Sequence, residues 1–262
     1  MDGDAVRSYD IGSHIPLRAR ALHLERHLPS FHQAFMRRAT TNGICTYCHA
    51  AISKNSRSIL SHLSNCQGKH PADKSGGADY VLLLIQGKYS PRYWLVIKAK
   101  SDITMRRIDK FIRDIWVECC GHLSQFSDTY STIPMTRLLA QVFSEGLKVD
   151  YVYDFGSSTE LSLSMIQTMQ DVDEKEIQIL FRNKEPEFVC SSCDKRAIAI
   201  CSYCVDEGEG FLCQSCMDKH KCVQEEGEDI LSLFVNSPRS GVCGYTGSID
   251  KQIKKYFPKN VL

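Results

Sequence analysis

The order of apolar and polar positions predicts one mixed domain over residues 79–182. From Thr104 to Cys119 apolar residues recur every three or four positions, which predicts an amphipathic helix capped by Asp102 or Thr104. Other segments are short β-rich runs or alternate apolar with polar residues, which is typical of strands. The expected strands are Tyr80–Gln86, Arg92–Lys98 (joined to the first as a hairpin), Lys148–Phe155, Leu161–Met165 and Ile177–Phe181. We therefore expect an α+β fold with a mostly antiparallel sheet and a packed helix.

The segments on either side of this domain lack such patterns. Residues 1–42 form the expected N-terminal extension, residues 69–78 a linker rich in structure breakers, and residues 223–262 a Gly-rich loop with a basic tail. His23 and His27 lie four residues apart in the extension. No third metal donor lies nearby, so we interpret both as solvated helix histidines.

Composition places the chain among ordinary globular proteins. It has 262 residues, of which 43% are hydrophobic and 24% charged. The acidic N-terminus does not resemble a secretory signal, and the longest apolar run, Tyr80–Ile85, is too short to cross a bilayer. Thirteen cysteines without an export signal favour reduced thiols and metal binding over disulfides. We therefore expect a cytoplasmic protein without a membrane segment.

The segment Phe188–Cys222 holds seven of the thirteen cysteines. Three C-x-x-C pairs precede a histidine and a final cysteine, which gives eight soft donors and is enough for two tetrahedral zinc sites. Pairs at such short intervals favour a cross-brace, in which alternate pairs share a metal, and the order resembles B-box-like zinc modules. The expected ligands are Cys190, Cys193, Cys213 and Cys216 at one zinc, and Cys201, Cys204, His220 and Cys222 at the other.

A third zinc site is predicted over residues 43–68, which contain the spacing C-x2-C-x13-H-x3-C. Ile52 and Ile59 stand where the small core of a ββα finger needs apolar side chains. His62 and Cys66 are four residues apart and face one side of a helix, as ligands of one metal must. We therefore predict a C2HC finger with the ligands Cys45, Cys48, His62 and Cys66, and three Zn²⁺ ions per chain in all.

The finger helix also carries candidate nucleic-acid contacts. With His62 as the seventh helical residue, the positions that would face a groove are Asn55, Ser58 and Ser61, flanked by Lys54 and Arg57. A single finger covers only about three base pairs and gives little affinity by itself. A small structural or protein-binding knuckle is an equal alternative.

Several short motifs of the central domain resemble the Ri-plasmid ORF-three-like family, also described as insertion-element passenger proteins. They are the strand at Tyr93–Lys98, the helix from Thr104, the H-L-x-x-F sequence at His122–Phe126 and the Y-D-F-G turn at Tyr153–Gly156. The resemblance covers roughly residues 79–181. It implies an α+β fold and an association with mobile genetic elements, and it implies no particular reaction.

No catalytic constellation emerges from the sequence. Cys119 and Cys120 stand close to His122, but no third group that would orient a nucleophile and its base is evident. Cys243 lies alone in the Gly-rich loop, and we interpret it as a free or buried thiol more readily than as an additional ligand. Every C-x-x-C pair belongs to a four-ligand site, which leaves no open zinc position for a reacting water. We expect a protein that is not an enzyme.

Charge distribution separates two functional hypotheses. Residues 171–229 carry seven basic against fifteen acidic side chains, whereas residues 230–262 carry five against one. The acidic zinc module would repel a phosphate backbone and suits a protein partner, which favours an adaptor or scaffold. The alternative is a nucleic-acid-binding accessory protein of a mobile element that acts through the Cys45–Cys66 finger and the lysines of the tail. The identity of the partner and the oligomeric state stay open in both.

Overall fold

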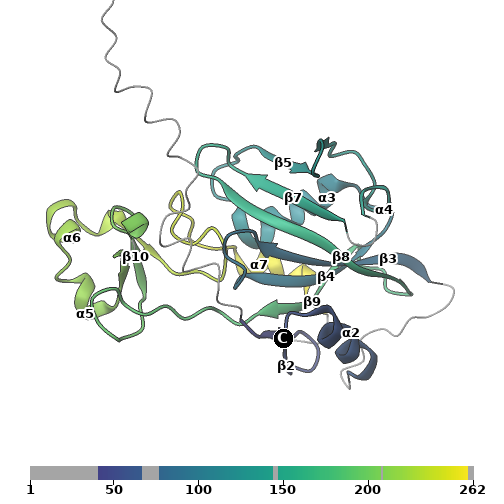
Figure 1. Ribbon diagram of the computed structural model, residues 1–262, viewed down its shortest axis with the longest axis horizontal. Helices are drawn as coiled ribbons and strands as arrows, with labels where there is room; N and C mark the ends of the chain where they lie inside the picture. The colour runs from purple at the N-terminus through teal and green to yellow at the C-terminus, as the bar shows by residue number, and fades with distance from the viewer. Residues whose placement is uncertain (1–40, 67–76, 144–146, 208, 259–262) are drawn as a thin grey trace, which may run out of the picture.

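The chain folds around one large antiparallel sheet, shown in Figure 1 as a computed structural model that describes residues 41–66, 77–143, 147–207 and 209–258. Its strands are β1 (Gly43–Cys45), β2 (Ala51–Ile52), β3 (Ala78–Gly87), β4 (Trp94–Lys100), β5 (Ser124–Ser127), β6 (Thr132–Ile133), β7 (Lys148–Tyr153), β8 (Thr159–Asp171) and β9 (Ile177–Asn183). They are ordered β2-β1-β9-β4-β3-β8-β7-β5-β6. The predicted α+β class is confirmed.

The predicted hairpin forms the centre of the sheet. Strands β3 and β4 pair from Tyr80 opposite Lys100 to Gln86 opposite Trp94. Because successive side chains of a strand point to opposite faces, Leu83 enters the core on one face and Leu82 the core on the other. Both are fully buried, so the sheet needs a covering layer on each side.

The first face is covered by the predicted helix. It consists of α3 (Met105–Ile112) and a π-helical turn, η4 (Arg113–Val117). Met105, Ile108 and Phe111 are fully buried against the sheet, as the apolar spacing predicts. The helix ends at Val117 rather than Cys119, because Glu118 already has an extended backbone. A short helix, α4 (Leu139–Val142), adds Leu139 to the same core.

The second face is covered by the cysteine-containing finger. Strand β1 pairs with β9, with Ile44 opposite Arg182, so the finger extends the sheet at its edge. Its helix α2 (Ser56–Asn65) lies beside β9 in Figure 1. Ile52 and Ile59 are buried with the sheet residues Trp94, Val96, Leu180 and Phe181. The two apolar residues predicted to form a miniature core therefore belong to the core of the whole sheet.

A second, three-stranded sheet lies in the C-terminal module, which comprises residues 188–233 without the undescribed residue 208. It has the order β11-β10-β12, from β10 (Ala199–Cys201), β11 (Phe211–Leu212) and β12 (Leu231–Leu233). Two short helices, α5 (Gln214–Met217) and α6 (Lys221–Glu226), stand beside it in Figure 1. The rings of Phe188, Phe211 and Phe234 cluster where the module meets the main domain, with centroids 4.5–5.4 Å apart. Phe188 stacks on Phe234, and Phe211 is inclined to both rings. This aromatic contact joins the module to the larger core.

The C-terminal segment packs against the main helix. It contains α7 (Asp250–Ile253) and a 3-10 turn, η7 (Lys254–Tyr256). The Tyr256 ring lies edge-on to Phe111 at 4.8 Å, and its hydroxyl donates to Asp114 Oδ2 at 2.7 Å. Lys255 Nζ lies 2.8 Å from the same oxygen. Lys255, one of the tail lysines considered for nucleic-acid contact, therefore has a structural partner.

Some predictions lie outside the described residues. They are the extension as far as residue 40 with His23 and His27, most of the linker, and Lys259. Among the residues that are described, no helix is both long and apolar enough to cross a membrane.

Candidate metal centres

The finger brings its four predicted ligands to one point. Cys45 ends β1, Cys48 follows in a tight turn, His62 lies on α2 and Cys66 follows that helix. Their donor atoms all lie within 4.8 Å of one another. Cys45 Sγ is 3.9 Å from Cys66 Sγ, and Cys48 Sγ is 3.3 Å from His62 Nε2. The ligands of one tetrahedral zinc, with bonds of about 2.0–2.3 Å, are roughly 3.5–3.8 Å apart, so this spacing fits a metal.

Local backbone geometry explains how two cysteines of the finger share a site. The chain turns back at Cys45, whose carbonyl oxygen accepts from His49 N at 3.0 Å, and His49 has a left-handed φ of 59°. Tyr47 N donates to Cys45 Sγ at 3.4 Å. Burial raises the pKa of the Cys45 thiol to about 12. A bound cation would be needed to hold this sulfur as a thiolate at neutral pH.

The C-terminal module brings its eight predicted donors together as two sets. The first set contains Cys190, Cys193, Cys213 and Cys216. Cys193 Sγ lies 3.6 Å from Cys213 Sγ and 3.7 Å from Cys216 Sγ. Although burial opposes ionisation, backbone N–H groups lower the pKa of the Cys190 thiol to about 6. An acidified thiol on a tight turn is a ready metal ligand.

The second set of the module contains Cys201, Cys204, His220 and Cys222. Cys204 Sγ lies 3.5 Å from both His220 Nε2 and Cys222 Sγ. The first and third C-x-x-C pairs thus share one set, and the second pair joins the H-x-C ending. This is the alternating arrangement that the spacing favours over consecutive pairing. The donors fit Zn²⁺, because thiolate and imidazole are its preferred ligands in closed four-ligand sites.

A fourth set was not anticipated from the sequence. Cys119, Cys120, His122 and Cys243 also have donor atoms within 4.8 Å of one another. The signal available in the sequence was the C-C-x-H cluster together with an unassigned thiol, but no fixed spacing links the cluster to Cys243. All thirteen cysteines lie in the described part of the chain, none of them forms a disulfide, and each belongs to one of the four sets.

The candidate nucleic-acid contacts are in part used by the fold. Lys54 Nζ donates to Gln86 Oε1 at 2.8 Å and to Pro91 O at 3.0 Å, which turns the ammonium toward the sheet. Asn55 caps α2 by accepting from Ser58 N at 2.8 Å. Arg57 and Ser61 are exposed on the outer side of the helix. Two of the five predicted contact side chains therefore have structural partners.

Comparison with known proteins yields little. No protein-family model matches this chain, and no curated protein matches it. Among solved structures, the chain is similar to the crystal structure of a protein of unknown function, MM3350 from Methanosarcina mazei Go1, with 16% sequence identity and a TM-score of 0.36. The similarity covers 39% of this chain and 68% of that chain. It supports no conclusion about function, and the resemblance to the ORF-three-like family stays a prediction.

Proposed function

We propose that this chain is a non-enzymatic zinc protein that binds another protein through its acidic C-terminal module. The observation that carries the proposal is the closed character of the predicted metal sets. Each set supplies four protein donors, and a catalytic zinc site keeps one position for water or substrate. Zinc held in this way stabilises small modules whose strands are too short to fold alone.

The surface of the module supports a protein partner. Seven acidic side chains on one stretch of the module are exposed: Glu207, Glu209, Asp218, Glu225, Glu226, Glu228 and Asp229. Tyr203 and Leu233 expose 59% and 68% of their surface on the same module. Lys219 and Lys221 are also exposed on this stretch, and Lys221 Nζ lies 3.6 Å from Glu225 Oε1, but acidic side chains outnumber them. A module that exposes apolar side chains and carries excess negative charge suits the docking of a basic protein segment.

The proposal is tested with the full chain and two matched double variants. Glu226→Lys with Glu228→Lys reverses charge on the module, whereas Glu174→Lys with Glu185→Lys reverses two exposed charges of the main domain. We expect a protein captured from cell extract by the wild type and by the main-domain variant to be lost by the module variant. The complex should weaken as salt rises. Equal capture by all three chains would argue against the acidic surface as the docking site.

The free thiols also bear on where such a protein works. Thirteen cysteines arranged as metal donors need a compartment that keeps them reduced, which supports a cytoplasmic location. Oxidation would convert donor pairs into disulfides and release the metal.

A second candidate function is nucleic-acid binding by the finger, as expected of a mobile-element accessory protein. The favouring observation is the outer side of α2, where Arg57 and Ser61 are exposed. Salt-sensitive binding of DNA or RNA should be weakened by Arg57→Ala and left unchanged by Arg106→Ala, which removes an exposed arginine from α3. Binding that responds to neither substitution would count against this function.

A further inference from the structure

The fourth Cys/His set joins two distant parts of the chain. Cys119, Cys120 and His122 follow the π-helical turn η4, and Cys243 lies in the C-terminal loop, 123 residues after Cys120. Cys120 Sγ is 3.9 Å from Cys243 Sγ, and Cys243 Sγ is 3.6 Å from His122 Nε2. A disulfide would need about 2.05 Å between the sulfurs. The spacing instead matches the three sets predicted from the sequence, where such distances run from 3.3 Å to 3.9 Å.

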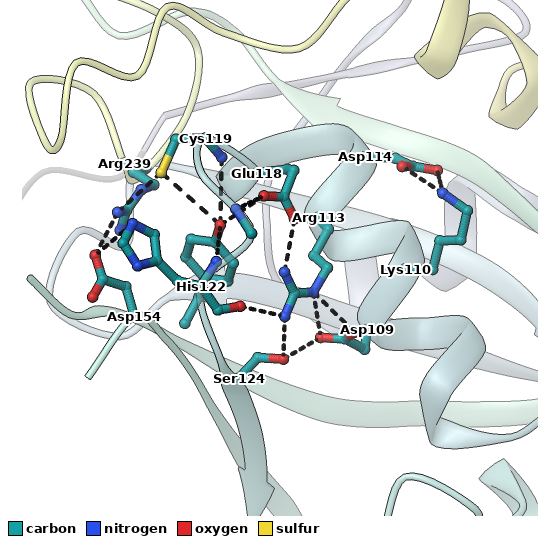
Figure 2. Close-up of polar contacts among 12 residues, drawn as sticks. Asp109, Lys110, Arg113, Asp114, Glu118, Cys119, His122, Ser124, Asp154 and Arg239 are labelled. Carbon is teal, nitrogen blue, oxygen red and sulfur yellow. Dashed lines mark hydrogen bonds and ion pairs between the residues drawn. The ribbon is translucent and has the colours of Figure 1, made fainter. Parts of the chain in front are cut away.

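Hydrogen bonds and an ion pair fix the conformation of the turn that carries Cys119, Cys120 and His122. Arg113 donates to the His122 carbonyl oxygen at 2.7 Å and pairs with Glu118 Oε2 at 2.7 Å (Figure 2). Glu118 Oε1 accepts from Gly121 N at 2.6 Å, and Gly121 has a φ of 74°, which glycine adopts without strain. The glycine therefore reverses the chain between Cys120 and His122, so that both side chains reach one point.

The loop that carries Cys243 is anchored at the same place. Trp116 Nε1 donates to Asn236 O at 3.1 Å, and Ser237 Oγ donates to Trp116 O at 2.6 Å. Cys243 itself has a φ of 53°, a left-handed conformation that non-glycine residues rarely adopt. Such strain persists only where the surroundings fix the residue, and here it directs the thiol toward His122.

The surroundings also suit an anionic metal complex. Figure 2 shows Arg239, Asp154, Cys119 and His122 gathered at the end of the helix. Arg239 is fully buried and donates to Cys119 Sγ at 3.3 Å and to Asp154 Oδ2 at 2.7 Å. Asp154 Oδ2 lies 3.5 Å from His122 Nε2. A zinc ion with three thiolates and one neutral imidazole has a net charge of −1. The Arg239 guanidinium donates to one of these three sulfurs and so stabilises it as a thiolate, while Asp154 balances the charge of the guanidinium.

We propose that Cys119, Cys120, His122 and Cys243 bind a fourth zinc ion, which fastens the C-terminal loop to the end of the main helix. With this set every cysteine of the chain has a role as a metal donor. The site has four protein ligands and thus no open position for catalysis. It differs from the other three in that two of its thiols, Cys120 and Cys243, are exposed, so a chelator removes this zinc first.

Metal analysis of the full chain tests the proposal. The chain is purified under reducing conditions, loaded with zinc and freed of excess metal. We expect four zinc ions per wild-type chain, three per Cys243→Ala chain, and four per chain of the neighbouring control Val242→Ala. Cys48→Ala, in the finger, should also bind three zinc ions per chain, and the double variant with Cys243→Ala should bind two. Such additivity shows that the two sites are separate.

Two further measurements keep the test decisive. If Cys243→Ala does not fold, Cys120→Ala removes a ligand from the other segment and should cause the same loss of one zinc. Hydrogen exchange in the loop 237–245 should speed up in the folded ligand variant and stay unchanged in Val242→Ala.

Three results would overturn the fourth zinc. One is a wild-type chain that binds only three ions when fully loaded. The second is a stoichiometry that neither ligand substitution changes. The third is a disulfide between Cys120 and Cys243 that persists in zinc-loaded protein prepared under reducing conditions, which would make the pair a redox couple. None of these results would bear on the proposed acidic docking surface, which is tested separately with the charge-reversal variants.

Discussion

Ile59 lies on the finger helix but is fully buried among side chains of the main sheet, including Trp94 and Phe181. The substitution Ile59→Ala removes three carbon atoms, which at about 0.8 kcal/mol for each buried group accounts for roughly 2.4 kcal/mol. The cavity that remains adds to this loss, so we expect a total of about 3–5 kcal/mol. The substitution should therefore destabilise the sheet as well as the finger.

The two tryptophans of the chain make this coupling measurable, because each reports on one face of the sheet. Trp94 lies in the core under the finger, and Trp116, on η4, lies in the core on the opposite face. Denaturant unfolding is followed by fluorescence in two backgrounds, Trp116→Phe and Trp94→Phe, each with and without Ile59→Ala. We expect both tryptophans to report the same loss of unfolding free energy.

The control is Arg57→Ala, an exposed position on the same helix, which should change stability by less than about 0.5 kcal/mol. If Ile59→Ala does not shift the unfolding transition reported by Trp116 fluorescence, the reasoning is refuted. It would show that the finger unfolds on its own and is not a layer of the main domain.

Three more predictions concern buried charges, pH and metal. Lys98 and Asp171 are both fully buried and form an ion pair, and Asp173 Oδ2 lies 3.0 Å from Lys98 Nζ. Lys98→Met would leave the buried Asp171 carboxylate unpaired, so the free energy of unfolding, measured with denaturant, should fall by about 3–5 kcal/mol. A loss below about 1 kcal/mol would contradict this prediction. Although burial opposes ionisation, hydrogen bonds from Lys255, Lys110 and Tyr256 lower the pKa of Asp114 in the folded protein. The stabilisation by this carboxylate is therefore complete above the pKa of an unfolded aspartate, about 3.9, and is lost as pH falls through the lower pKa of the folded state. The stability difference between the wild type and Asp114→Asn should accordingly be constant at neutral pH and vanish below that range, whereas a difference that grows on acidification would show the opposite sign. Chelation of metal at neutral pH should reduce the circular dichroism of the chain, because the strands of two or three residues in the C-terminal module cannot persist without their metals. An unchanged spectrum would show that the module folds without them.

The sequence by itself determined the elements whose cause is local. A C-x-x-C pair needs only one turn to present two thiols, so spacing alone indicated which twelve donors meet in the finger and the module. Helix α3 followed from periodicity, because side chains on one face of a helix recur at fixed intervals. Hairpin β3–β4 followed from two apolar, β-rich runs with the breakers of Gly87–Pro91 between them. In each case the residues that interact are close along the chain.

Only the tertiary structure decided contacts between distant segments. Strand β1 has three residues, too few for any alternation to show that it pairs with β9. Arg239 is a single arginine in a Gly-rich loop, which looks solvated in the sequence, yet it is fully buried against Asp154. The fourth Cys/His set depends on this loop packing against Trp116, since no pattern of spacing can relate Cys243 to a histidine more than a hundred residues earlier. Such contacts arise from packing of the whole chain, so they cannot be predicted from the local sequence.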